Sequence, residues 1–165
     1  MGTQQILLIV LSVIIVGAAI AVGIQMFNNQ AYSANKSALA ADAQSFATQI
    51  VQYYKTPESQ GGAGRPTDAM PIADIGKYIG WDGDNSDSKG TEGGNYKLAA
   101  STATTVTILG LGKELRGDFR PAVRTIVTLP EGTIKADLID TDKTYDTLAS
   151  TDFDEEETDS GDDEV

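Results

Sequence analysis

Oxygen-bearing side chains gather between Asp82 and Ser88, where the chain reads Asp-Gly-Asp-Asn-Ser-Asp-Ser. Oxygen ligands at alternate positions suit a hard cation such as calcium. An EF-hand loop would need glycine where Asp87 stands and a bidentate glutamate where Gly93 stands, and Glu92 is one residue out of register. Acidic loops rich in glycine and serine are usually solvated turns. We therefore expect no metal site here, with calcium binding as the alternative.

Other catalytic chemistry has few residues to work with. The chain of 165 residues contains no cysteine and no histidine, which removes the thiolate nucleophile, the imidazole base and the Cys/His zinc site. Lysines and carboxylates are present, but no spacing marks any of them as a general acid or base. We expect a protein that is not an enzyme and holds no cofactor.

The negative charge is concentrated at the end of the chain. The formal net charge is -12, and the segment from Asp152 to Val165 contains nine acids and no base. Without that segment 15 acids face 12 bases, so the rest is nearly neutral. A segment of this composition repels itself and buries little, so residues 151–165 are predicted to be a disordered acidic tail. No nucleic-acid binding is expected from either part.

The elements that organise the chain begin with an uncharged stretch. The first thirty-five residues carry no charged side chain, and residues 6–24 are almost wholly apolar and free of proline. As a helix these nineteen residues would be about 28 Å long, close to a hydrocarbon core of about 30 Å. Residues 1–27 are therefore predicted to be an apolar half-helix that resides in a membrane or in a bundle of copies of itself.

The helix is predicted to continue into water. Residues 28–56 contain no glycine or proline, and the apolar positions follow steps of four and three, which form one stripe of an amphipathic helix. These positions are Leu39, Ala43, Phe46, Ile50 and Tyr53. Pro57 and the glycines at 61, 62 and 64 then end the helix. A continuous helix over residues 3–55 would be about 80 Å long.

A β-rich globular head is predicted for residues 57–150. After a short helix within 71–81, strands are expected at 96–100, 104–109, 122–129 and 133–139. The last two alternate apolar and polar residues around Pro130-Glu131-Gly132, which predicts an antiparallel hairpin with one buried face. A small sheet must bury that face against another element, and the amphipathic stripe is available. The fold class is therefore α+β, a long N-terminal helix packed against a small antiparallel sheet.

This arrangement resembles a type IV pilin or pilin-like subunit. The resemblance lies in roughly the first fifty-five residues, including the run Gly17-Ala18-Ala19-Ile20-Ala21-Val22, and in the outline of the head. It implies a structural subunit that waits in the inner membrane, is extracted by pilus or secretion assembly machinery, and forms a helical homo-oligomeric filament at the cell surface. In that family the apolar half-helices bundle at the filament centre and the heads form its outer surface.

The chain also departs from the family pattern. The family usually has a basic leader ending in glycine, followed by a phenylalanine and a glutamate in the apolar run. Here Gly2 is followed by Thr3, and the uncharged Gln4 and Gln5 stand near the usual glutamate. Gly23 falls about where the family places a helix-bending proline, so a kink or local unwinding there is one of two open outcomes.

Two sets of residues are predicted to make the contacts of such a subunit. Small residues four positions apart let another helix approach closely, and bulky apolar residues complete the interior face. The filament-packing residues are Leu7, Leu11, Ile14, Gly17, Ala18, Ala21 and Gly23. Leu39, Phe46 and Ile50 are predicted to hold the sheet against its own helix.

Other interpretations of the N-terminus remain open. The sequence Ala19-Ile20-Ala21 also fits a small-x-small secretory cleavage site. The same segment fits a single membrane span that holds a periplasmic or extracellular binding module, which would not polymerise.

Overall fold

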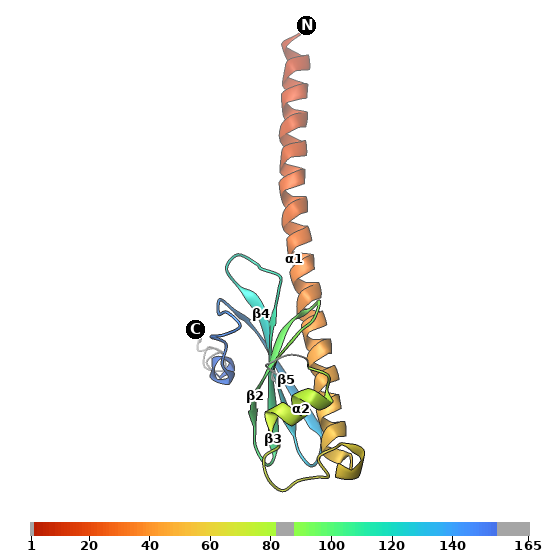
Figure 1. Ribbon diagram of the computed structural model, residues 1–165. Helices are drawn as coiled ribbons and strands as arrows, with labels where there is room; N and C mark the ends of the chain where they lie inside the picture. The colour runs from red at the N-terminus through yellow and green to blue at the C-terminus, as the bar shows by residue number, and fades with distance from the viewer. Residues whose placement is uncertain (1, 82–87, 155–165) are drawn as a thin grey trace, which may run out of the picture.

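The computed structural model describes residues 2–81 and 88–154 of the 165-residue chain. The predicted α+β fold is confirmed: a long N-terminal helix lies beside a five-stranded antiparallel sheet (Figure 1). The helices are α1 (Thr3–Lys55) and α2 (Ile72–Tyr78), with short 3-10 turns η1 (Glu58–Gln60) and η2 (Ser150–Phe153). The strands are β1 (Ser88–Gly90), β2 (Gly94–Ser101), β3 (Thr105–Gly112), β4 (Arg120–Thr128) and β5 (Thr133–Thr141). The suspected calcium loop, Asp82 to Asp87, lies outside the described residues.

Helix α1 runs without interruption from Thr3 to Lys55. It passes through Gly23 without a break, so of the two outcomes left open there the structure has the unbroken helix. It ends where Thr56 takes an extended conformation, φ -73° and ψ 132°, as expected for a residue that precedes proline. Lys55 in the last turn adds a favourable charge at the C-terminal end of the helix dipole.

The sheet is a simple meander with strand order β1-β2-β3-β4-β5. The predicted hairpin is β4–β5, in which Val123 faces Leu138 and Val127 faces Ile134. Gly132 in its turn has a φ of +82°, the left-handed conformation for which glycine is suited. Strand β1 was not predicted, because its three residues carry no pattern of their own and pair only with β2.

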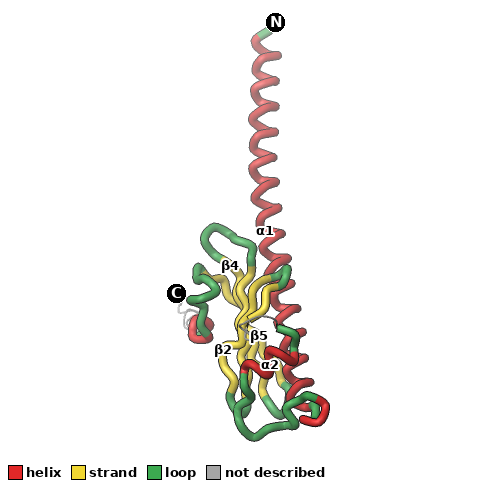
Figure 2. The backbone as a smooth tube through the Cα atoms, viewed as in Figure 1, coloured by secondary structure: helices red, strands yellow, loops and turns green. Residues whose placement is uncertain are grey.

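One face of the sheet packs on the second half of α1. The shared core includes Leu39 and Ile50 from α1, Tyr96 from β2 and Val123 and Val127 from β4. Helix α2 and the residues after it close one end of this core with Ile75, Ile79 and Trp81. The second half of α1 runs alongside the sheet (Figures 1 and 2), and the residues of the amphipathic stripe belong to the core between them.

The prediction of a single buried face is wrong, because the opposite face of the sheet is covered as well. Residues 142–154, which we call the C-terminal strap, lie on the side of the sheet away from α1 (Figure 2). A second apolar core forms between the strap and the sheet. It consists of Leu109, Leu111, Ala122, Ile139, Leu148 and Phe153, with Tyr145 packed against it.

The predicted tail therefore starts too early at residue 151. Turn η2 runs from Ser150 to Phe153, and the side chain of Phe153 is buried. The carboxylate of Asp152 accepts a hydrogen bond from the Ala149 backbone N–H at 2.7 Å and pairs with Lys143. Asp154 pairs with Arg124 of β4. These contacts fix the first acids of the segment to the head, which thus extends to residue 154.

Candidate assembly surface

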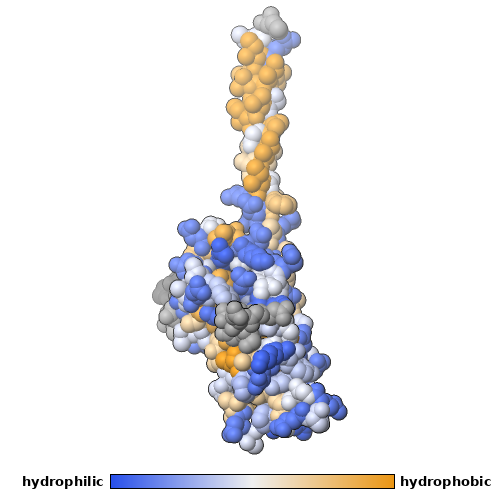
Figure 3. All heavy atoms as spheres, viewed as in Figure 1, coloured by the Kyte–Doolittle hydropathy of each residue, from blue (hydrophilic) through white to orange (hydrophobic). Residues whose placement is uncertain are grey.

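The first half of α1 projects from the head and makes no core with it. We call its apolar residues from Ile6 to Phe27 the apolar column. The buried residues of α1 begin at Tyr32, and the apolar residues that precede it are exposed on every side of the helix. In Figure 3 this half is largely orange, with paler residues between the orange ones, and the visible face of the head below it is mostly blue. By length and composition α1 is able to cross a membrane.

The predicted filament-packing residues all lie on this exposed column. Leu7, Leu11 and Ile14 are 70%, 51% and 61% exposed. The small residues Gly17, Ala18, Ala21 and Gly23 are exposed too. A Cβ built on Gly17 or Gly23 would have nothing within 4 Å outside the helix. In the single copy described, none of these residues meets a residue of the head, so their proposed contacts would all be with other molecules.

Within the column, one polar group is already satisfied. The Ser12 hydroxyl donates a hydrogen bond to the Ile9 carbonyl at 2.8 Å, as expected for serine inside an apolar helix. The serine therefore presents little unsatisfied polarity to a bilayer or to a neighbouring helix.

The residues predicted to hold the sheet belong to the core between α1 and the sheet or pack against it. Leu39 and Ile50 are fully buried, and Phe46 is partly buried. The Phe46 ring makes edge contacts with Trp81 and Tyr96, with ring centres 5.3 Å and 5.1 Å away. Aromatic pairs of this geometry add to the stability that burial provides.

The sequence did not predict the hydrogen bonds that join helix α1 to Tyr96 of β2 and to Thr91. The Tyr96 hydroxyl donates to the Leu39 carbonyl or the Asp42 carboxylate, each 3.3 Å away. Thr91 donates to the same carboxylate at 2.8 Å. Burial raises the pKa of the Tyr96 hydroxyl above its ordinary value, and the nearby negative charge of Asp42 raises it further, so the phenol stays neutral.

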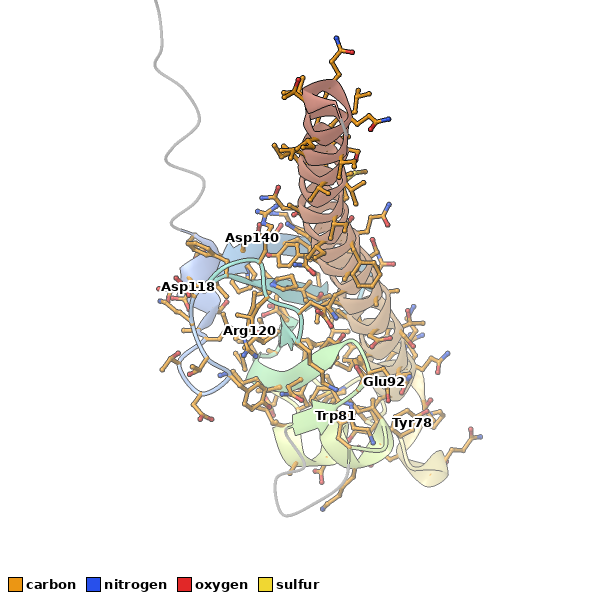
Figure 4. All side chains as sticks on the ribbon, turned by 90° about the horizontal axis from the view of Figure 1, so that it is seen from above. Tyr78, Trp81, Glu92, Asp118, Arg120 and Asp140 are labelled. Atoms are coloured by element: carbon orange, nitrogen blue, oxygen red, sulfur yellow. The ribbon has the colours of Figure 1, made fainter. Side chains whose placement is uncertain are left out.

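A charged cluster at the neck, where α1 leaves the head, was also missed. Asp140 at the end of β5 pairs with Lys36 of α1 at 2.9 Å and with Arg116 of the β3–β4 loop at 3.1 Å. The Arg116 guanidinium lies over the Tyr32 ring, 4.9 Å from its centre. Figure 4, seen from above, places Asp140 beside α1. The cluster ties helix, sheet and loop together at the base of the exposed column.

The electrostatics of the neck favour an ionised Asp140. Burial alone would raise the pKa of Asp140, but the hydrogen bond from Lys36 and the charges of Lys36 and Arg116 outweigh it and lower that pKa. The carboxylate therefore remains charged at neutral pH and holds its two cations.

Beside the neck, a shallow groove runs between α1 and the edge strand β5. Ser33, Lys36, Ser37, Ala40, Ala41 and Gln44 line one side, and Leu138 lines the other. Leu138 shares with Ile134 and Ala136 the face that the alternation within 133–139 predicts to be buried. It is nevertheless 37% exposed, because β5 is the last strand of the sheet and has no neighbour beyond it. In the parts of the chain that the structure describes, no group of three or more acidic, histidine or cysteine residues is arranged to hold a metal ion.

Comparisons with protein-family models, with curated proteins and with solved structures each gave no match. The arrangement of helix and sheet can be compared with known proteins by its general shape alone. A long N-terminal helix, apolar in its first half and packed on an antiparallel sheet in its second, gives the molecule a pilin-like shape.

Proposed function

We propose that the chain is a structural subunit that polymerises through its apolar half-helix into a filament with the heads on the outside. The observation that carries the proposal is the exposed apolar column, which is continuous with the helix that forms the core of the head. Exposed patches of this size on a soluble monomer mark a surface that another molecule or a membrane covers.

The energetics require a partner for the column. From Ile6 to Phe27 its large side chains are between 51% and 71% exposed. Removing such a side chain from water is favourable by on the order of 1 kcal/mol. Burial in a bilayer and burial in a bundle of copies would both supply this free energy. Small residues four positions apart favour the bundle, because they let the backbone of a second helix approach closely. Such pairs are Gly17 with Ala21 and Ala19 with Gly23.

Because α1 is one continuous helix, it would couple the position of each head to the packing of the helices at the filament centre. The buried contacts of Leu39 and Ile50 and the neck cluster fix the head to the helix. Packing of the columns would therefore set the positions of the heads, and force applied to a head would reach the filament centre through one unbroken helix. A flexible linker between column and head would not transmit position in this way.

The same proposal includes where the subunit is located before and after assembly. Before assembly the column would reside in the inner membrane, and pilus or secretion machinery would extract the subunit into an extracellular filament. The resemblance to pilins supports this route, and the bilayer-matched length of the column supports its first stage.

A second candidate function is a single-span anchor for a periplasmic or extracellular binding module. The observation that favours it is that one helix long enough to cross a membrane satisfies the bilayer without any partner. The two candidates differ in whether contacts between columns matter.

Replacement of Ala21 separates them. Ala21→Leu keeps the column apolar and able to span a bilayer but blocks close approach of a second backbone. We expect it to reduce the yield of filaments, seen by electron microscopy of material sheared from cells, by about tenfold, because a loss of about 1.4 kcal/mol lowers an association constant tenfold. Ala21→Ser keeps the small size and serves as the matched control, with filaments at the normal level. Ala21→Arg should abolish assembly.

The controls make the outcome readable. Mass spectrometry of the first residues of the sheared material reports whether the column is kept, and Trp81 fluorescence reports that the head is folded, because Trp81 is buried in the head core. Normal filaments from Ala21→Leu would refute packing through this face. A complete lack of filaments from the unmodified chain, with every copy single in the membrane, would favour the anchor.

A further inference from the structure

The loop between β3 and β4, residues 113–119, carries two apolar side chains that the head does not cover. Leu115 is 49% exposed and Phe119 is 50% exposed. Single exposed apolar residues are common on protein surfaces. These two differ in their place, because the loop rises at the end of the head from which the apolar column emerges (Figure 1).

The contacts of the loop fix its height along α1. The guanidinium of Arg116 lies over the Tyr32 ring, and the backbone N–H of Glu114 donates to the Asn35 side-chain oxygen at 3.4 Å. Tyr32 stands five positions, or about 7.5 Å along the helix, after Phe27, the last exposed apolar side chain of the half-helix 1–27. The polar headgroup region on each side of a hydrocarbon core is about 5–8 Å thick. With the column in a bilayer, the loop would lie at the headgroups.

The loop is an ordered turn. Arg116 and Phe119 form a two-way backbone pair, with N–H to carbonyl distances of 2.9 Å and 3.4 Å. Gly117 in the turn has a φ of +67°, which glycine adopts without strain. The turn therefore holds Leu115 and Phe119 in place, and docking them would cost little conformational entropy.

The charge of the loop also suits a lipid surface. Residues 113–120 contain three bases and two acids, in a chain whose net charge is -12. Bases beside a membrane are attracted to anionic headgroups, and apolar side chains between them insert at the boundary of headgroups and acyl chains. Figure 3 shows apolar atoms at the upper end of the head beside the helix.

From these observations we propose that the β3–β4 loop docks on the membrane surface while the subunit is unassembled, with Leu115 and Phe119 inserted among the headgroups. The loop and the column would then form one continuous membrane-binding surface and set the tilt of the head. This inference rests on the membrane stage of the proposed function and does not depend on filament formation.

Tryptophan quenching by brominated lipids tests it on the full chain in dilute vesicles of phosphatidylcholine and phosphatidylglycerol. Phe119→Trp reports the loop. Glu131→Trp, also an exposed position, is the matched control at the other end of the head, since its neighbour Gly132 lies against Val51, nineteen positions beyond Tyr32 and thus about 28 Å along α1. The signal of the buried Trp81 is common to both variants and is subtracted with the unmodified chain.

We expect lipids brominated near the headgroup to quench Phe119→Trp at least about twofold more than Glu131→Trp, because quenching needs contact with the bromine-bearing region. Equal quenching of the two variants would overturn the proposal, whether both are quenched or neither. A blue shift of Phe119→Trp that grows with protein-to-lipid ratio, without quenching, would assign the loop to contacts between copies and would also overturn it.

Leu11→Trp separates failure of this inference from failure of the proposed function. If Leu11→Trp is quenched by deep bromines while Phe119→Trp is not quenched, the column resides in the bilayer and only the loop contact is refuted. If Leu11→Trp is not quenched, the membrane stage itself is refuted, and the loop contact falls with it.

Discussion

The covering of the outer face of the sheet by the C-terminal strap is open to a direct test. Phe153→Ala removes a ring that is 3% exposed and packs in the second core. Truncation of a buried phenylalanine costs about 3–5 kcal/mol. The ring also faces the Arg124 guanidinium, 5.3 Å from its centre, and such a contact adds about 0.5–1 kcal/mol. The gap lies near the end of the ordered chain and partly closes, so we expect a loss of about 3 kcal/mol.

The measurement is guanidinium unfolding of the full chain in a mild detergent, followed by Trp81 fluorescence. Trp81 belongs to the core between α1 and the sheet, so it reports unfolding of the head as a whole. With a denaturant slope of about 3 kcal/mol per molar, the midpoint should fall by about 1 M.

A matched control uses the same chemical change at an exposed site. Phe119→Ala removes a ring that is 50% exposed, and its effect on the free energy of unfolding should be below about 0.5 kcal/mol. If Phe153→Ala and Phe119→Ala shift the midpoint equally, the strap contributes nothing to the stability of the head, and the second core is not a core.

The parts of the fold that follow local rules could be predicted from the sequence. The apolar residues change from all round the helix to a single stripe, which predicted both halves of α1, and Pro57 set its end. The β4–β5 hairpin followed from alternation and from Gly132 in the turn. The exposed column follows from composition alone, because nothing in a single small head can cover so many apolar residues.

The parts that depend on distant partners could not be predicted. Arg124 alternates with buried residues and so suggests exposure, yet its side chain is only 11% exposed. Its charge is compensated by Asp137 from the next strand and Asp154 from the acidic segment. Only the folded chain brings these three together. Phe153 was obscured in the same way, because its acidic neighbours gave the whole segment a disordered composition.

The neck cluster illustrates the same limit at the candidate site. Lys36, Arg116 and Asp140 are separated by dozens of residues and belong to α1, a loop and β5. No spacing rule links them, although each is an ordinary surface residue by type. The column that the cluster supports was visible in the sequence, whereas the device that fixes the column to the head required the structure.

Two further predictions concern the head. First, the pKa of Asp140 is lowered on folding, so its ionised form contributes stability that is full above its unfolded pKa of 3.8 and is lost as pH falls through its folded pKa. Asp140→Asn should lower stability at pH 7 and flatten the fall in unfolding midpoint as the pH drops from about 5 to about 3, and an unchanged slope would contradict the assignment. Second, Gly110→Ala would place a Cβ 2.7 Å from the Tyr96 ring and 2.8 Å from Val123, too close for a packed core to accept without movement. We expect a loss of about 1–3 kcal/mol in the same guanidinium assay, because overpacking forces neighbours off their rotamers. A variant as stable as the unmodified chain would show that the Tyr96 ring, which joins the sheet to Leu39 and Phe46 of α1, is not held firmly enough to fix the head on its helix.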